Sequence, residues 1–351
     1  MTYFSSKEEI NKKELAAISL LWSITAAGLA SLVLVFFLKN VLLPIPGNNP
    51  VYSFLFISGT LFITYFSGLF FAQRQFSYPH LIPAIVNILV TIFYAWLLIA
   101  DRKDEVQLAI IIYFGGFMTS GILLGALYYQ KYNVPFLLQF PTSHTIKKLL
   151  QYSAIALLAN VVSFLAYRID YWILKSLSPK FVSHGGLGNY IQVGKLVQLF
   201  LFAPTVVAAI AFPISAAAVD PNFKHTLKRT TWRVLFLNGF ACFALVVMGK
   251  WLFTFLYGDS FSQMYECFLY SIPAILSISI TRILASYFAG TNRIRYNLIG
   301  GLIALVSVAT LNFLLIPKMG INGAALADSI GYMLLMIFLL TLFQLKDRNV
   351  I

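Results

Sequence analysis

The chain has 351 residues, of which 60% are hydrophobic and 11% are charged, and its mean hydropathy is +0.82. Soluble domains are typically about 45–50% apolar and about 25% charged, so this composition excludes an ordinary soluble protein. A net charge of +13 would suggest nucleic acid as a partner of a soluble protein. Here the basic residues lie between apolar blocks, as the topology rule of membrane proteins requires, and we expect no nucleic-acid partner.

Ten apolar blocks follow one another along the chain, and about 20 apolar residues suffice for a helix to cross a bilayer. The pattern therefore predicts an all-α protein, a polytopic bundle of about ten transmembrane helices. The predicted spans are residues 15–38, 51–73, 79–100, 106–130, 147–175, 189–217, 231–256, 266–289, 296–316 and 321–345.

The distribution of Lys and Arg predicts the orientation of these spans. If the N-terminus is cytoplasmic, fifteen of the 25 basic residues lie in cytoplasmic segments, seven in outside segments and three within spans. Since cytoplasmic segments carry the excess of Lys and Arg, both termini are predicted to be cytoplasmic.

A segment with two prolines, Tyr132 to Thr145, joins the fourth and fifth spans. It resembles an amphipathic linker that lies on the cytoplasmic face. We therefore predict two lobes: a four-helix lobe in residues 1–145 and a six-helix lobe in residues 146–351.

The fifth span carries an unusual number of polar residues. On a helical wheel a stripe within an arc of about 100° contains Asn160, Ser163, Tyr167, Asp170 and Tyr171. Such a stripe is costly in contact with lipid. Either part of this polar stripe faces a water-filled cavity, or Asp170 pairs with a residue of a neighbouring helix.

Arg168 points away from Asp170 on the same wheel, so these two residues are not a simple intrahelical pair. Arg168 lies nearer Lys175, and both side chains could instead extend to the outer interface.

The sixth span carries Gln192, Lys195 and Gln198 at every third position. A lysine this far into a span is costly unless it meets an anion or an acid. Its candidate partners are Asp170, Asp328 and a substrate phosphate, and a structural Lys–Asp pair is the alternative to a binding role.

Arg282 in the eighth span either reaches the cytoplasmic side or lines a cavity. Asp328 in the tenth span follows a run of small residues and is expected to bond to a neighbouring helix. Three basic residues within spans against two acids favour a cavity for an anionic head group.

No motif of an enzyme is present in the sequence. There is no phosphate-binding loop, no Ser/His/Asp set, no HExxH and no CxxC, and the histidines lie in loops or at span ends. Cys242 and Cys267 lie in or beside apolar blocks, where small hydrophobic roles suffice. We expect neither catalysis nor a cofactor or metal.

The second half of the chain resembles the bacterial polysaccharide-repeat flippases of O-antigen type. They belong to the superfamily of multidrug, oligosaccharidyl-lipid and polysaccharide exporters, which also holds the MATE-type exporters and the peptidoglycan lipid-precursor flippase. The resemblance covers about residues 147–345 and rests on these runs: Arg168-Ile169-Asp170 before Ile173-Leu174, Gly188-Asn189-Tyr190, Gly194-Lys195-Leu196, Ala211-Phe212-Pro213-Ile214-Ser215, Trp251 to Gly258, and Ile316-Pro317-Lys318-Met319-Gly320-Ile321-Asn322-Gly323-Ala324-Ala325.

This resemblance implies a V-shaped fold of two facing bundles. It implies that the chain moves an undecaprenyl-pyrophosphate-linked oligosaccharide across the bacterial cytoplasmic (inner) membrane by alternating access, for surface polysaccharide (lipopolysaccharide) synthesis. The implied partners are this polyprenyl pyrophosphate, membrane lipids, and a polysaccharide polymerase with its assembly proteins. The implied cavity cations are Arg168 and Lys195, and more weakly Arg282.

The chain departs from the family pattern at its front, since the family typically has twelve or more spans. Residues 1–14 resemble the cytoplasmic loop before the family's third span, so the first lobe is expected to lack two helices.

Two other functions stay open. A cation-coupled exporter of drugs or metabolites would need a dominant carboxylate in the first four spans, which contain none in their interior. A polysaccharide polymerase or assembly subunit would favour a long outside loop.

Overall fold

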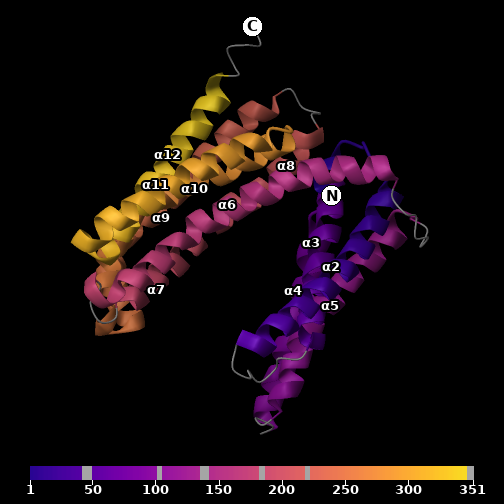
Figure 1. Cartoon of the computed structure of the whole chain (residues 1–351), viewed down its shortest axis with the longest axis horizontal. Coiled ribbons are helices and arrows are strands. Elements are labelled where there is room, and N and C mark those ends of the chain that lie inside the picture. Colours follow the sequence, from indigo (N-terminus) through magenta and orange to yellow (C-terminus); the bar gives the residue numbers. More distant parts are fainter. Residues whose placement is uncertain (42–49, 101–104, 135–141, 182–185, 218–221, 346–351) are drawn as a thin grey trace. The chain divides into compact units, whose positions relative to one another are not determined.

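A computed structural model describes residues 1–41, 50–100, 105–134, 142–181, 186–217 and 222–345. Within these ranges every regular element is a helix (Figure 1). The elements are α1 (Thr2–Ser6), α2 (Lys12–Val41), α3 (Pro50–Ala72), α4 (Ser77–Ile99), α5 (Val106–Lys131), α6 (Ser143–Phe181), α7 (Gly186–Phe200), α8 (Phe202–Ala217), α9 (Phe223–Tyr257), the 3-10 turn η1 (Asp259–Phe261), α10 (Gln263–Gly290), α11 (Ile294–Met319) and α12 (Ile321–Leu345).

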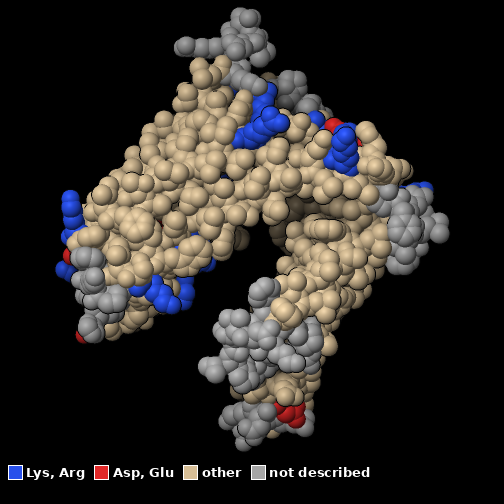
Figure 2. All heavy atoms as spheres, in the orientation of Figure 1, with Lys and Arg blue, Asp and Glu red and all other residues tan. Residues whose placement is uncertain are grey.

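In the described residues, nine helices are long and apolar enough to cross a membrane, and the bent pair α7 and α8 adds a tenth span if it is counted as one. The predicted all-α, polytopic architecture is confirmed. On the face shown in Figure 2, Lys and Arg gather near the ends of the helices, and the surface between is almost free of charge. That surface suits lipid chains.

The chain divides into two compact units, Met1–Lys147 and Lys148–Ile351. The middle of the predicted amphipathic linker, residues 135–141, lies outside the described residues.

Unit 1 is built around α3, which contacts α1, α2, α4 and α5. The glycine Gly59 lets α3 approach α5, because a Cβ atom there would lie 2.5 Å from the backbone nitrogen of Met118. Close approach of this kind is how small residues hold membrane helices together. Next to it, Phe66, Phe70 and Tyr128 are buried and their rings pack on one another.

Unit 2 is built around α10, which contacts α7, α8, α9, α11 and α12. Its side chains Phe268 and Ile275 are fully buried, together with Leu174, Ile316 and Ala324 from three other helices. The helix that the bundle surrounds is therefore the eighth predicted span.

Helix α6 extends beyond the predicted span, from Ser143 to Phe181. Its backbone stays farther from its neighbours than that of the other spans in this unit. Ile173 and Leu174 near its C-terminal end belong to the core, whereas Leu157 and Leu158 are 64% and 54% exposed. Apolar packing thus holds one end of α6 much more firmly than the other.

The predicted span 189–217 consists of two helices, α7 and α8, bent by 44° at Leu201, which together are apolar enough to form one broken span. Pro204 has no N–H group to donate to the carbonyl of Phe200, four residues earlier. That carbonyl accepts a hydrogen bond from Asn238 Nδ2 of α9 at 3.0 Å, and Asn238 also donates to Ser279 Oγ of α10. A side chain of α9 therefore satisfies the carbonyl at the break, and Ser279 of α10 helps to position it.

Candidate substrate cavity

Unit 2 contains a cavity of about 670 Å³ between α6 and the helices α8, α10, α11 and α12. Ligand sites in proteins usually measure about 300–1,000 Å³, so this volume suits a small organic group. The polar or aromatic residues that line it are Tyr152, Asn160, Ser163, Phe164, Tyr167, Phe212, Thr281, Arg282, Ser286, Asn297 and Tyr332.

Arg282 is the one charged side chain among the described lining residues. It is exposed, and no hydrogen bond or ion pair within the described ranges engages it. A guanidinium group has five N–H donors and stays charged. An arginine at membrane depth without an acidic partner suits a water-filled cavity that receives an anion.

The amides of the cavity also have free hydrogen-bonding capacity. Asn297 Nδ2 donates to the Ala285 carbonyl at 2.8 Å, but its buried Oδ1 atom has no partner. No hydrogen bond to Asn160 occurs in the described part of the chain. The hydroxyl of Ser163 donates a hydrogen bond to the Ala159 carbonyl of its own helix.

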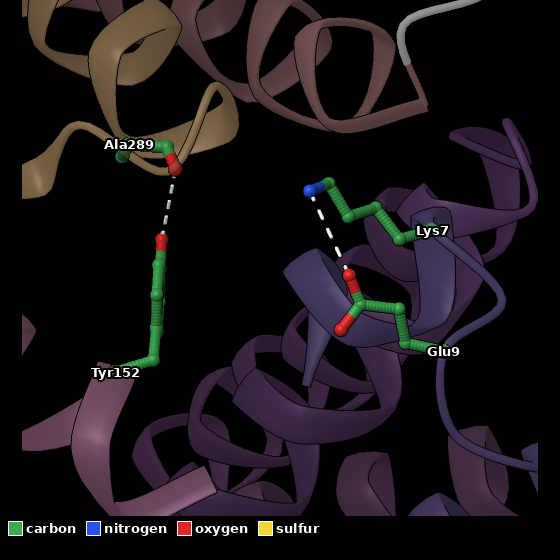
Figure 3. Close-up of polar contacts among 4 residues, drawn as sticks. All are labelled: Lys7, Glu9, Tyr152 and Ala289. Atoms are coloured by element: carbon green, nitrogen blue, oxygen red, sulfur yellow. Dashed lines mark hydrogen bonds and ion pairs between the residues drawn. The ribbon is translucent and has the colours of Figure 1, made fainter. Parts of the chain in front are cut away.

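A hydrogen bond between two helices crosses one end of the cavity. The Tyr152 hydroxyl of α6 donates to the Ala289 carbonyl in the last turn of α10 at 3.1 Å (Figure 3). Both residues line the cavity. The bond joins the weakly packed end of α6 to the central helix of the unit.

A smaller pocket of about 40 Å³ adjoins the cavity and shares Tyr167 and Tyr332 with it. It contains Asp170 of α6 and Asp328 of α12. Tyr190 of α7 lies between them, and its hydroxyl contacts Asp170 Oδ2 and, at 2.8 Å, Asp328 Oδ2.

The Tyr190 hydroxyl therefore links acids of two helices, Asp170 of α6 and Asp328 of α12.

Local packing fixes this acidic pocket. The Tyr171 ring of α6 lies 5.4 Å from the Tyr190 ring in a tilted arrangement, and the Tyr171 hydroxyl is so close to Gly194 that it would clash with a Cβ atom there. Gly194 therefore brings α7 close enough to α6 for Tyr190 to reach Asp170.

The structure brings several predicted residues together. Asn160, Tyr167 and Arg282 line the cavity, and Asp170 lies in the adjoining pocket. Gln198 Nε2 donates to the Tyr167 hydroxyl at 3.2 Å.

Four predicted residues line neither space: Arg168, Gln192, Lys195 and Gln198. Arg168 lies over the rings of Tyr167 and Tyr171, 5.3 Å from each centroid. Lys195 is exposed on α7 and Gln192 is half-buried there.

The alternative that Lys195 pairs with Asp170 or Asp328 is not supported. Within the described ranges the ion pair found is Lys7 with Glu9, and Tyr190 contacts the two acids instead. The expected bond of Asp328 to a neighbouring helix is present. The described residues also contain no group of three His, Cys, Asp or Glu side chains that could hold a metal.

Sequence reasoning did not assign a role to Tyr152, Asn297 or Tyr332, and it noted Tyr190 only within a motif. Tyr190 could have been found, since it follows a glycine-rich segment that leads into a span with polar residues. The other three have no local signal that separates them from ordinary span residues.

Comparison with known proteins decides the family. A model of the family described as lipid II flippase MurJ matches residues 12–349. The chain belongs to the MurJ family. As a MurJ-family protein it is a multi-pass membrane transporter of the superfamily that the sequence motifs indicated.

Solved structures support the fold of this MurJ-family chain. A mutant MATE transporter VcmN from Vibrio cholerae superposes with a TM-score of 0.83 at 12% identity, over 99% of this chain and 82% of that one. The bent form of VcmN gives 0.77 at 13% identity with the same shares. A MOP superfamily transporter from Pyrococcus furiosus gives 0.67 at 13% identity, over 98% of this chain and 82% of that chain.

At these identities the likeness shows the fold alone. Among curated proteins, no sequence matches the chain. The superfamily predicted from the motifs is confirmed, whereas the narrower O-antigen type is not supported by the family match.

Proposed function

We propose that the chain moves a polyprenyl-pyrophosphate-linked oligosaccharide across the bacterial cytoplasmic membrane by alternating access. The observation that supports this most is Arg282, a cation that has no acidic partner among the described residues and lies in a cavity among membrane spans. Phosphate oxygens match the forked donors of arginine and would offset the cost of placing it there.

The rest of the lining suits a sugar. Asn160 and Asn297 supply amide groups with unused capacity, and sugar hydroxyls both donate and accept hydrogen bonds. The rings of Tyr152, Phe164 and Tyr167 offer apolar faces for the C–H groups of a pyranose ring.

Arg168, Lys195, Gln192 and Gln198 stay in the proposal as contacts outside this cavity. Lys195 is exposed on α7. Asp170, with Asp328, is proposed to support the site from the smaller pocket rather than to touch the substrate.

Entry to the cavity is proposed to occur at the Tyr152 end of α6. The neutral hydrogen bond from Tyr152 to the Ala289 carbonyl crosses that end and contributes about 0.5–1.5 kcal/mol. The opposite end is held by the buried side chains Ile173 and Leu174 and by the contact of Asp170 with Tyr190. The helix is therefore expected to pivot on its C-terminal part.

Two head groups have separate support. The ordered sequence motifs favour the repeat unit of a surface polysaccharide such as O-antigen, and the family match favours lipid II. We propose the repeat unit first, with both termini in the cytoplasm and with the polymerase and its assembly proteins as downstream partners.

Complementation and transport assays test the proposal. The chain is expressed in a strain without its O-antigen flippase and in one depleted of its lipid II flippase. The purified protein is also placed in vesicles with a fluorescent polyprenyl-pyrophosphate trisaccharide. We expect O-antigen to return to the surface and the fluorescent lipid to reach the opposite leaflet.

Rescue of the lipid II strain alone would assign lipid II as the substrate in place of the repeat unit. Folded protein that moves neither lipid in vesicles and rescues neither strain would refute the function.

A further inference from the structure

A second pocket, separate from the substrate cavity, lies in unit 1 and measures about 370 Å³. Residues before and at the start of α2 and residues just after α5 line it, so it lies where two spans reach the same membrane boundary. A pocket at that depth faces lipid head groups rather than acyl chains.

Two ammonium groups line this pocket. Lys12 Nζ donates to Gln73 Oε1 at 2.9 Å and lies 5.5 Å from the centre of the Tyr132 ring. An ammonium group has three N–H donors, so Lys12 keeps donors for a ligand. No bond of the Lys13 ammonium to another described residue is present, and it is exposed.

The carboxylate of Glu8 also lines the pocket. The adjacent Lys7 pairs with Glu9 at 3.6 Å rather than with Glu8 (Figure 3). Hydrogen bonding to Tyr3 raises the pKa of Lys7, so Lys7 stays charged and interacts with Tyr3 and Glu9. Within the described residues the Glu8 carboxylate has no partner.

The backbone at Glu8 has a φ of +55°, a left-handed conformation that is uncommon for a glutamate. Two turn hydrogen bonds hold it, from the Glu8 N–H to the Ser5 carbonyl and from the Glu9 N–H to the Phe4 carbonyl. Phe4 is only 3% exposed, so the turn is fixed to the core of the unit. A strained residue at a pocket suits a site whose geometry is prearranged.

Part of the remaining wall is apolar, since Ile10 and Val134 are both 7% exposed and line it together with the Tyr132 ring. Ser5 and Asn11 complete the lining. An inorganic anion would find two lysines but would also face the unmatched Glu8. A metal cation would face the two lysines. A ligand with one phosphate, one primary ammonium and an apolar continuation matches all three parts.

We propose that this pocket binds the head group of an aminophospholipid, with its phosphodiester at Lys12 and Lys13 and its primary ammonium at Glu8. The glycerol backbone then packs on Ile10 and Val134. A quaternary ammonium has no N–H to donate to a carboxylate, so the pocket discriminates against phosphatidylcholine. A soluble phosphoethanolamine carries the same phosphate and primary ammonium but lacks the apolar part, so it is the other possible source of this head group.

The test measures lipid retention by the full-length protein. The protein is stripped of lipid in neutral detergent and offered phosphatidylethanolamine, phosphatidylglycerol or phosphatidylcholine. Retention is measured by native mass spectrometry, with free phosphoethanolamine as a competitor. We expect phosphatidylethanolamine to be retained best and phosphatidylcholine least. Competition by the free compound at equal concentration would assign the site to the soluble source.

Two variants separate the contributions. Lys13→Gln is expected to lower phosphatidylethanolamine retention roughly fivefold, the effect of one lysine near a lipid phosphate. Glu8→Gln is expected to remove the preference for phosphatidylethanolamine over phosphatidylglycerol. Lys250→Gln, an exposed lysine of α9 in the other unit, is the matched control and should change nothing.

Equal retention of the three lipids would overturn the proposal. So would an effect of Lys13→Gln no larger than that of Lys250→Gln, or an ethanolamine preference that survives Glu8→Gln. These results do not depend on transport, so they are independent of the proposed flippase function.

Discussion

The two units are made of helices with the same overall hydropathy but have different interiors. Mean hydropathy is 1.8–2.3 for the spans of unit 1 and 1.7–2.3 for those of unit 2. Unit 1 buries rings such as Phe66, Phe70 and Tyr128 against glycines. Unit 2 holds Arg282 and the pair Asp170 and Asp328 at membrane depth. Hydropathy therefore identifies the membrane spans, and the few polar side chains within them locate the site.

The largest expected effect is on the packing of unit 1. Gly59→Ala places a Cβ atom 2.5 Å from backbone atoms of α5, which cannot move as a side chain could. We expect most of the protein to be lost from the monodisperse fraction after extraction in mild detergent. Gly28→Ala is the control, because nothing lies within 4 Å of its Cβ position. Equal yields of the Gly59→Ala and Gly28→Ala variants would show that α3 and α5 can move apart without loss of the fold.

The next effect should fall on the cavity of unit 2. Arg282→Ala removes the cation proposed to bind phosphate, and hydrogen bonds to charged groups contribute about 1.5–3 kcal/mol, so transport should fall roughly 10- to 100-fold. The vesicle assay measures this rate. Arg282→Lys should keep part of it, since charge remains without the fork. Unchanged transport by the alanine variant would remove Arg282 from the site.

A stability effect is expected in the acidic pocket. Tyr190→Phe removes the hydroxyl between two carboxyl groups and leaves them without that partner. Buried polar groups that lose a partner cost about 1–3 kcal/mol, which lowers the melting temperature by several degrees. Tyr332→Phe, in the same pocket, makes the same chemical change and should have a smaller effect. A thermal scan in detergent that finds the two equal would contradict the bridging role.

A smaller effect is expected at the Tyr152 end of the cavity. Tyr152→Phe removes one neutral hydrogen bond, which shifts the open population by up to about 10-fold. The readout is the rate at which a thiol reagent labels a cysteine placed at Ser163, since Cys242 and Cys267 are buried. Tyr167→Phe, on the same helix and cavity, is the control. Faster labelling in the control than in Tyr152→Phe would argue against entry at this end.

The smallest effect is expected for Lys195→Ala. The ammonium group is exposed and its removal leaves no buried acid without a partner. We expect a decrease in vesicle transport of about two- to fivefold. A loss as large as that of Arg282→Ala would move the phosphate contact to α7.

Much of the fold could be predicted because apolar length alone defines a membrane span. Arg282, Asn160 and Tyr167 could be predicted because polar groups within spans are rare. Tyr152 and Asn297 could not, because their importance comes from bonds to another helix, α10. Tyr152 bonds to a carbonyl 137 residues away, and helical periodicity carries no information about such pairs.

The break at Leu201 likewise depends on a contact between distant parts of the chain, in this case a contact to a backbone carbonyl. Pro204 signals a bend, but the donor to the freed Phe200 carbonyl, Asn238, lies in another helix and has no signal near the proline. Pairing of Lys195 with an acid was the alternative that the charged residues of the spans left open. In the described residues a tyrosine of the same span, Tyr190, contacts both acids instead.

The break also has a consequence for how the protein enters the membrane during synthesis. Spans leave the ribosome in order, and the carbonyl of Phe200 has no helical donor because of Pro204. Its partner Asn238 is made 38 residues later. The bent span is therefore expected to reside in the insertion channel, or beside water, until α9 arrives. Release of these helices into lipid would then occur as a pair rather than one at a time.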